Sequence, residues 1–364
     1  MKFVALVSGG KDSIFSIMEA VARGHELVCT ANLAPPPDQE TGATPLETDS
    51  YMYQTAGHDA VLGLAECFQV PMVRGFVRGS ALAQGLTYSA TEGDEVEDML
   101  LLLADCKRRF PGVDAVCSGA ILSTYQRLRV EHVCGRLGLR SVGLLWQRDQ
   151  AGLLGEMIEK GVDAVLVKVA SIGLDPFRHL NQSLAVLQPH LTRTNQRYGM
   201  HVCGEGGEYE TLVLDCPLFK RKLVLDETEV CVHSEGSQDP QVGVLAVRSW
   251  HTESKRELEQ TPSPLSPPPP PHPLVLYVDE EATKAMLEGL AGLAAAAATA
   301  ALAEDSSSLT SMYVAGDQVL LSGITFKGGG AASPTLTSTN TSTSTPTSTS
   351  KGSPKEEEEE EEEE

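Results

Sequence analysis

The chain opens with the stretch that decides its fold, Phe3-Val4-Ala5-Leu6-Val7-Ser8-Gly9-Gly10-Lys11-Asp12-Ser13. The apolar run Phe3–Val7 predicts a buried strand, the two glycines predict a tight turn, and a helix follows at once. Such a turn gathers backbone N–H groups at the positive end of the helix dipole, where anions bind. Because Ser8 and Ser13 add hydroxyl groups and Lys11 adds a positive charge, we predict that Ser8–Ser13 is a phosphate-binding loop.

A simpler interpretation of this stretch is a plain strand-to-helix turn in which Asp12 or Ser13 caps the helix. The stretch is not a Walker A motif, which has four residues between its first glycine and the Gly-Lys pair. The complete string from Ser8 to Ser13, placed directly after the strand, favours phosphate binding.

Apolar runs and longer amphipathic stretches alternate through the first 230 residues or so. The apolar runs are predicted as buried strands: Phe3–Val7, Leu27–Leu33, Met72–Val77, Val113–Cys117 and Ala164–Val169. The amphipathic stretches are predicted as helices: Ser13–Ala22, Ser50–Phe68, Glu95–Phe110, Ser123–Leu137 and Leu153–Lys160. This order predicts an α/β fold, a doubly wound, Rossmann-like parallel sheet with helices on both faces.

The composition changes after Val232 and divides the chain into four predicted segments. Residues 1–232 form the α/β domain, and 233–273 form a polar, proline-rich linker. Residues 274–327 are predicted as an incomplete α+β segment with a short strand at Leu274–Val278, an Ala-rich helix and a hairpin at Ser311–Phe326. Residues 328–364 are rich in Ser and Thr, end in poly-Glu, and are predicted to be disordered.

The charge and cysteine content exclude several classes of function. The chain of 364 residues has 50 acidic against 28 basic residues, a net charge of −22, and nine of the acids form the run Glu356–Glu364. So acidic a chain is a poor candidate for binding nucleic acid or an anionic membrane. None of its eight cysteines has CxxC spacing, which predicts reduced thiols and a cytoplasmic protein. The apolar stretch Leu290–Ala303 is shorter than the roughly 20 residues of a membrane span.

The Ser8–Ser13 string resembles the SGGxDS signature of the N-type ATP pyrophosphatases, the PP-loop enzymes. In these enzymes the loop holds the departing pyrophosphate while the α-phosphate is transferred to a substrate oxygen. The resemblance implies ATP as the cosubstrate, Mg²⁺ bridging its phosphates, and adenylation chemistry.

Four further strings narrow the substrate. They are Asp49–Thr55, Glu92–Asp98, Ser118–Glu131 and Cys203–Thr211, the last containing EGGEYET. Together with the PP-loop they resemble the diphthine–ammonia ligase family over residues 1–230. The resemblance implies ATP-dependent amidation of diphthine on translation elongation factor 2 to diphthamide, using ammonium. An acyl-adenylate would form, with release of AMP and pyrophosphate. The segment 274–327 is similar to a remnant of a RidA-like domain.

The loop Ser118-Gly119-Ala120-Ile121 leaves the carboxyl end of a predicted central strand, where doubly wound sheets bind their ligands. We therefore predict that these four residues contact the nucleotide, with a plain strand-to-helix turn as the alternative. Arg127 and Arg129, two residues apart on the following helix, point to different faces. One of them could meet a phosphate, while the other pairs with Glu131.

Acidic residues stand out in the last string. Glu208 and Glu210 alternate along a predicted strand, so both carboxylates face the same way, and Glu205 lies in the preceding glycine loop. Three converging acids repel one another unless a cation lies between them, such as Mg²⁺, ammonium or the trimethylammonium group of diphthine. A solvated edge strand is the alternative. With Lys11 and Asp12, these acids are the predicted catalytic residues.

The acids in Glu92–Asp98 have two interpretations. They cap a helix, with Asp94 as N-cap and Glu97 completing a capping box, or they bind substrate or Mg²⁺.

Two other functions fit the PP-loop. One is a tRNA thiolase or amidase, which the acidic charge and the lack of CxxC disfavour. The other is a non-catalytic ATP-binding interaction module, which the intact Lys11-Asp12-Ser13 disfavours. Since residue 2 is Lys and no glutaminase domain is evident, free ammonium is the expected nitrogen donor.

Overall fold

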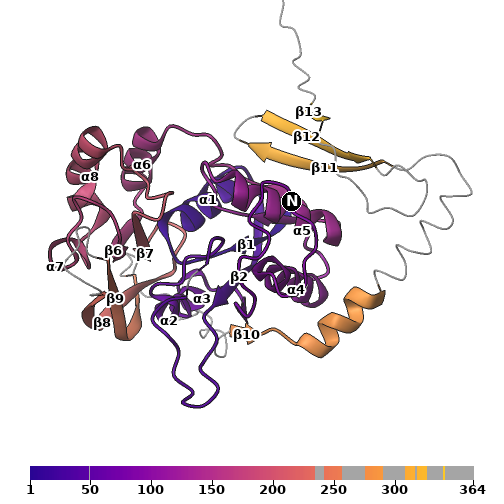
Figure 1. Cartoon of the computed structure of the whole chain (residues 1–364), viewed down its shortest axis with the longest axis horizontal. Coiled ribbons are helices and arrows are strands. Elements are labelled where there is room, and N and C mark those ends of the chain that lie inside the picture. Colours follow the sequence, from indigo (N-terminus) through magenta and orange to yellow (C-terminus); the bar gives the residue numbers. More distant parts are fainter. Residues whose placement is uncertain are drawn as a thin grey trace, which may run out of the picture.

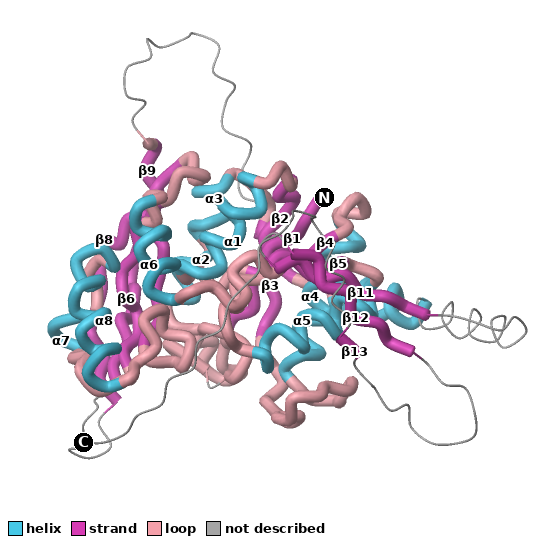
Figure 2. Tube along the Cα trace, turned by 90° about the horizontal axis from the view of Figure 1, so that it is seen from above, coloured by secondary structure: helices cyan, strands magenta, loops and turns pink. Residues whose placement is uncertain are grey.

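The computed structural model describes residues 1–48, 50–233, 242–255 and 275–289, and strand backbone at 308–315, 318–325 and 339–340. The strands of this described part form two sheets, which lie toward opposite ends of the molecule (Figure 2). No helix there is both long and apolar enough to cross a lipid bilayer.

The larger sheet contains a run of parallel strands. In sheet order they are β10 (Val275–Tyr277), β3 (Met72–Phe76), β2 (Glu26–Ala34), β1 (Lys2–Leu6), β4 (Ala115–Cys117) and β5 (Arg140–Val142). Every neighbouring pair in this run is parallel. The chain fills the sheet from β1 to β3 in one direction and then restarts at β4 on the other side of β1. The predicted doubly wound α/β fold is therefore confirmed, and its switch point lies between β1 and β4.

Helices cover both faces of this sheet (Figure 1). The helices labelled in Figure 1 are α1 (Lys11–Ala22), α2 (His58–Val61), α3 (Gly63–Phe68), α4 (Glu95–Arg109), α5 (Thr124–Leu137), α6 (Gln150–Glu159), α7 (Pro176–His179) and α8 (Leu184–Tyr198). Of these, α7 and α8 contact β6 (Asp163–Val169) of the smaller sheet, and α6 packs against α8. Successive residues of β1 face opposite cores. Phe3 packs in the core that contains Ile14 of α1, whereas Val4 packs in the core that contains Met99 of α4.

The smaller sheet is antiparallel and corrects one prediction. Its strands are β7 (Tyr209–Asp215), β6 (Asp163–Val169), β9 (Val242–Ser254) and β8 (Arg221–His233), in that order. The run Ala164–Val169 was predicted for the parallel sheet, but it lies in β6 and pairs antiparallel with β7 and β9. The predicted partners of this strand were therefore wrong. A strand that is buried on both faces is a continuous apolar run in either kind of sheet, so its sequence does not tell which sheet it joins.

Two predicted boundaries also change. The helix predicted over Ser50–Phe68 is wrong in its first half, where residues 50–57 form a loop and Gly57, with a φ of +74°, precedes α2. The Ser50 hydroxyl accepts hydrogen bonds from the N–H groups of Met52 and Tyr53, which closes a local turn in place of a helix. The predicted linker 233–273 contains β9, so the antiparallel sheet continues to Ser254.

The carboxyl-terminal segment supplies strands to both edges of the large sheet. At one edge, β10 confirms the strand predicted at Leu274–Val278. At the other edge, β11 (Ser308–Ala315) pairs with β5 and forms with β12 (Gln318–Thr325) the hairpin predicted at Ser311–Phe326. The short β13 (Thr339–Asn340) pairs with β12. The Ala-rich stretch, the proline run and the poly-Glu tail lie outside the described residues. Apart from the linker boundary corrected above, the division into four segments stays a prediction.

Candidate functional site

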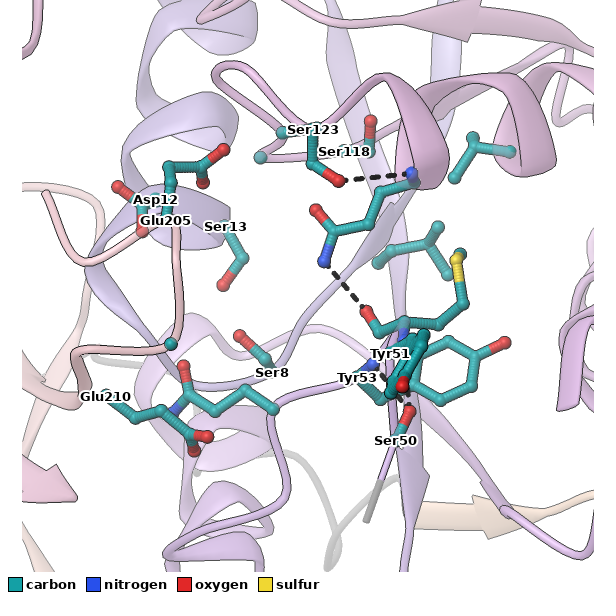
Figure 3. A pocket seen from close by; sticks show the side chains of 18 of the residues that line it. Ser8, Asp12, Ser13, Ser50, Tyr51, Tyr53, Ser118, Ser123, Glu205 and Glu210 are labelled. Atoms are coloured by element: carbon teal, nitrogen blue, oxygen red, sulfur yellow. Dashed lines mark hydrogen bonds between the residues drawn. The ribbon is translucent and has the colours of Figure 1, made fainter. Parts of the chain in front are cut away.

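A cavity of about 690 Å³, here called the central pocket, opens at the carboxyl ends of β1 and β4 (Figure 3). Four segments contribute most of its walls: Val7–Ser13, Ser50–Gln54, Ser118–Gln126 and Cys203–Thr211. Each of the motif strings singled out in the sequence, except Glu92–Asp98, therefore supplies residues to one cavity. Its volume is in the range of small-molecule and cofactor sites.

The predicted phosphate-binding loop, Ser8–Ser13, leads into α1. Gly9 has a φ of +92°, which favours glycine, and the Ser13 hydroxyl donates to the Gly10 carbonyl at 2.9 Å. The N-cap is Gly10, and no side chain caps the helix. The alternative in which Asp12 or Ser13 caps the helix is therefore wrong. An N-terminus without a side-chain cap, facing a pocket, suits an anionic ligand.

Strand β7 holds this loop in place. The Val213 N–H donates to the Gly9 carbonyl at 2.9 Å, and the Lys11 N–H donates to the Thr211 hydroxyl at 3.0 Å. The Gln54 side-chain amide also donates to the Thr211 carbonyl at 2.8 Å. The last residue of the EGGEYET string thus contacts the PP-loop directly, an arrangement that the sequence did not predict.

Lys11 is almost fully buried but still lines the pocket. Its ammonium group donates to the Asp12 carboxylate at 2.8 Å and to the Cys203 carbonyl, and it lies 5.1 Å from the centroid of the Tyr209 ring. Burial alone lowers the pKa of Lys11, but the negative charge of Asp12 and weaker contributions from Tyr209 and Cys203 raise it above its usual value. The side chain therefore remains charged at neutral pH.

One carboxylate oxygen of Asp12, Oδ2, accepts a hydrogen bond from Lys11. Burial raises the pKa of Asp12, Lys11 opposes that rise, and the nearby charge of Glu205 adds to it. Its Oδ1 atom is buried and has no hydrogen-bond partner within the described part of the chain. This oxygen is a candidate ligand for a cation.

The loop after β4 packs tightly against the start of α1. A Cβ atom added at Gly119 would lie 2.6 Å from the Ser13 backbone nitrogen, so only glycine fits. Ser118, Gly119 and Ala120 line the pocket, as predicted from their place in the sheet. Ile121 does not line it, because its side chain is buried in the core below.

The three predicted acids do not converge. Glu205 accepts from the N–H groups of Ile121 and Leu122, Glu208 from those of His201 and Gly206, and Glu210 from that of Ala56. Figure 3 shows Glu205 and Glu210 in different parts of the pocket. No cluster of three or more His, Cys, Asp or Glu residues suited to a metal occurs in the ranges that the structure describes. Over these ranges the structure therefore does not support a metal ion held by all three acids.

Glu210 forms an ion pair with a lysine. It lines the pocket and lies 3.7 Å from the Lys168 ammonium group. Burial raises the pKa of Glu210 to about 7, Lys168 opposes the rise, and Glu47 adds to it. A carboxyl group that titrates near neutral pH is suited to exchanging a proton with a substrate. Glu208 closes its own glycine loop and does not line the pocket.

The acids of Glu92–Asp98 organise neighbouring loops. Asp94 caps α4 by accepting from the Val96 N–H at 3.0 Å, as predicted. Glu97 does not complete a capping box, because its carboxylate pairs with Arg136 at 2.8 Å. Glu95 accepts from the Ser50 hydroxyl at 2.6 Å and thereby holds the 50–54 wall of the pocket. The structure favours the capping interpretation over substrate binding.

Arg127 and Arg129, the two arginines near the start of α5, have separate roles. Arg127 pairs with Glu131 at 3.0 Å, as one of the alternatives predicted. Arg129 is fully buried and donates to the carbonyl oxygens of Tyr125, Ala83 and Gly85. His201, which the sequence analysis missed, accepts at Nδ1 from the N–H groups of Cys203 and Glu205 and so shapes the glycine loop.

Comparison with known proteins identifies the family. One family model, described as the diphthamide synthase N-terminal domain, matches residues 1–141, and another, the diphthamide synthase C-terminal domain, matches residues 149–241. This chain belongs to the diphthamide synthase family. The boundary between the two models falls between β5 and α6, where the parallel sheet gives way to the elements of the antiparallel sheet.

Curated relatives of the family are named "Diphthine--ammonia ligase". The Danio rerio protein is 50% identical over 258 residues, which are 71% of this chain and 99% of that protein. The Homo sapiens protein is 48% identical over 255 residues, 70% of this chain and 94% of that protein. The Schizosaccharomyces pombe protein is 50% identical over 236 residues, 65% of this chain but 38% of that longer protein. The predicted membership of a ligase family is confirmed.

Proposed function

We propose that this chain is a diphthine–ammonia ligase that uses ATP and ammonium to amidate diphthine on translation elongation factor 2. The observation that carries the proposal is the direct joining of the PP-loop to the EGGEYET segment around the central pocket. The names of the relatives supply the reaction. We place the protein in the cytoplasm, where its substrate is.

We place ATP in the pocket with its phosphates at one end and its adenine at the other. Its phosphates lie on Ser8–Ser13, where the N-terminus of α1 and the charged Lys11 favour negative charge. The adenine lies toward the apolar wall formed by Leu33, Met99 and Leu102. The α-phosphate then faces the middle of the pocket, between the Ser118–Ala120 loop and the 203–207 loop.

Mg²⁺ suits the donors at the phosphate end. Magnesium in nucleotide sites is held by one or two carboxylates together with substrate phosphates, and does not require a full protein cage. Asp12, with its unpartnered Oδ1, and the nearby Glu205 are the residues that would hold it. When bound, it neutralises charge on the departing pyrophosphate.

The reaction has two steps. The diphthine carboxylate oxygen attacks the α-phosphorus, and the bond to the pyrophosphate oxygen breaks, giving an acyl-adenylate. Ammonia then attacks the acyl carbon, the bond to the AMP oxygen breaks, and the nitrogen loses a proton to leave the amide. Adenylation converts an unreactive carboxylate into a good acyl donor, so one difficult step becomes two easier ones. The loops contribute mainly by positioning the reactants.

Glu210 is the acid we assign to the nitrogen donor. It lines the pocket, and its pKa of about 7 allows it to accept a proton from ammonium at neutral pH. Glu208 is bonded to its own loop, and Glu205 lies at the phosphate end.

The test is release of pyrophosphate from ATP by the purified protein, with elongation factor 2 that carries diphthine. Release should depend on both ammonium and diphthine. Lys11→Ala should lower kcat by about 10²–10³-fold, the usual cost of removing a group that stabilises transition-state charge. Lys222→Ala, at a half-exposed lysine of β8 that pairs with Glu253, is the control and should be unchanged.

Two outcomes contradict different parts of the proposal. Pyrophosphate release that does not depend on diphthine contradicts the ligase function. A fully active Lys11→Ala protein contradicts the placement of the phosphates.

A further inference from the structure

Two tyrosines form an aromatic corner in the wall of the central pocket. Tyr51 belongs to the loop between β2 and α2, and Tyr125 belongs to α5. Their ring centroids lie 6.1 Å apart with the planes at 66°, an edge-to-face contact. Both side chains line the pocket, and Tyr51 is 55% exposed. Two of the eight tyrosines of the chain therefore meet edge to face in the pocket wall.

The exposure of Tyr51 is not due to a loose loop. Glu95 accepts from the Tyr51 N–H at 3.2 Å and from the Ser50 hydroxyl at 2.6 Å. The side chain of Gln126 donates to the Met52 carbonyl at 3.1 Å, which ties the loop to α5. The backbone is therefore fixed, and the ring is held open toward the pocket.

Arg129 packs against the ring of Tyr125. The Arg129 guanidinium lies 3.2 Å from its ring centroid, so one face of Tyr125 is already covered. The exposed ring of Tyr51 is consequently the main surface that the corner offers to a ligand.

The carboxylates of the pocket do not offer an equivalent site for a large cation. Glu205 accepts hydrogen bonds from the backbone N–H groups of the 121–122 loop, and Glu210 lies beside Lys168. Glu208 does not line the pocket. In Figure 3, Tyr51 and Tyr53 lie on the opposite side of the pocket from Asp12 and Glu205. A quaternary ammonium group has no N–H to donate and an apolar surface of methyl groups. It is therefore recognised by aromatic faces more readily than by hydrogen-bonded carboxylates.

We propose that Tyr51, supported by Tyr125, forms a subsite for the quaternary ammonium group of the substrate. The inference rests on the proposed function, because the trimethylammonium group of diphthine is attached beside the carboxylate that reacts. The subsite places that group on the aromatic side of the pocket and directs the carboxylate toward the phosphate side. It also selects the trimethylated substrate over its unmethylated amine precursor.

The kinetic test uses the full chain and elongation factor 2 that carries either diphthine or the unmethylated amine. Tyr51→Leu should raise the KM for the trimethylated protein roughly 3- to 30-fold, the usual worth of a cation–aromatic contact. The KM for ATP and that for the amine substrate should not change. Tyr51→Phe keeps the ring and should behave as wild type. Tyr198→Leu, at a 49% exposed tyrosine of α8 outside the pocket, is the control.

An unchanged KM for the trimethylated protein in Tyr51→Leu would overturn the subsite, as would an equal rise for both protein substrates. A second measurement separates this result from a failure of the proposed function. Tetramethylammonium chloride, titrated against sodium chloride of equal ionic strength, should shift the Tyr51 ring resonances in an NMR spectrum of the wild-type protein. That shift requires no ligase activity. Its absence would overturn the subsite even in an active enzyme.

Discussion

Replacing Gly119 by alanine tests how closely the two pocket loops approach each other. The new Cβ would lie 2.6 Å from the Ser13 nitrogen and 2.7 Å from the Asp12 carbonyl carbon. Both are backbone atoms, so no side-chain rotation relieves the clash. The loop after β4 and the start of α1 must separate until these contacts reach an ordinary distance of about 3.4 Å.

The expected cost follows from overpacking. Adding a methyl group to a tightly packed site lowers the free energy of unfolding by about 1–3 kcal/mol. For a domain of this size each kcal/mol shifts the Tm by about 2–4 °C. Calorimetry should therefore show a Tm about 2–12 °C below wild type. Isothermal titration should show weaker ATP binding, because Asp12 and Ser13 belong to the phosphate loop.

Gly135→Ala is the matched control. Gly135 lies inside α5, and a Cβ there would meet no atom within 4 Å. Alanine favours a helix by about 1 kcal/mol over glycine, so this variant should be as stable as wild type or more stable. If Gly119→Ala melts and binds ATP like wild type, the close approach of the two loops is wrong.

Three further predictions concern the rest of the domain. Burial raises the pKa of Glu210 to about 7, so its protonated form stabilises the fold below pH about 4.5 and that contribution is lost as the pH rises through 7. Glu210→Gln should therefore gain in urea-unfolding free energy relative to wild type between pH 5 and pH 8, and an equal difference at both pH values would contradict this. Arg129→Leu leaves buried carbonyl oxygens without their charged donor and should lower the free energy of unfolding in urea by about 2–4 kcal/mol. A decrease below about 1 kcal/mol would show that these hydrogen bonds contribute little to stability. A chain truncated after Lys255 should keep its ligase activity and a native circular dichroism spectrum. A chain truncated after residue 241 lacks β9 and should lose both. Equal behaviour of the two truncated chains would contradict the place of β9 in the sheet.

The parts of the fold that the sequence predicted correctly are determined locally. The strand, the Gly-Gly turn and α1 follow one another within a few residues, so local propensity and the glycine at Gly9 are enough to predict these elements, although β7 supplies the contacts that hold the turn. The loop Ser118–Ala120 was placed correctly because the carboxyl ends of parallel strands meet at one edge of a sheet.

The errors concern partners far apart in the sequence. The strand β6 was recognised as a strand, but its burial pattern carries no information on which sheet it joins. Alternation along a strand gives the face on which Glu210 lies, but not the Ala56 N–H and Lys168 that it meets there. Likewise, the amphipathic pattern of Ser50–Phe68 predicted a single helix. Its first half is a loop, because the Ser50 hydroxyl accepts a backbone N–H and closes a turn that competes with helical hydrogen bonds.

The hydrogen bond between the Lys11 N–H and the Thr211 hydroxyl joins residues 200 positions apart, and it has a consequence for folding during synthesis. At about 5–20 residues per second, a ribosome needs roughly 10–40 s to make that intervening chain. During this interval the nascent chain carries the complete PP-loop string but lacks the strand that fixes its backbone. Under the proposed function, we therefore expect ATP binding only after both sheets have formed, and we expect a fragment of the first 141 residues not to bind ATP.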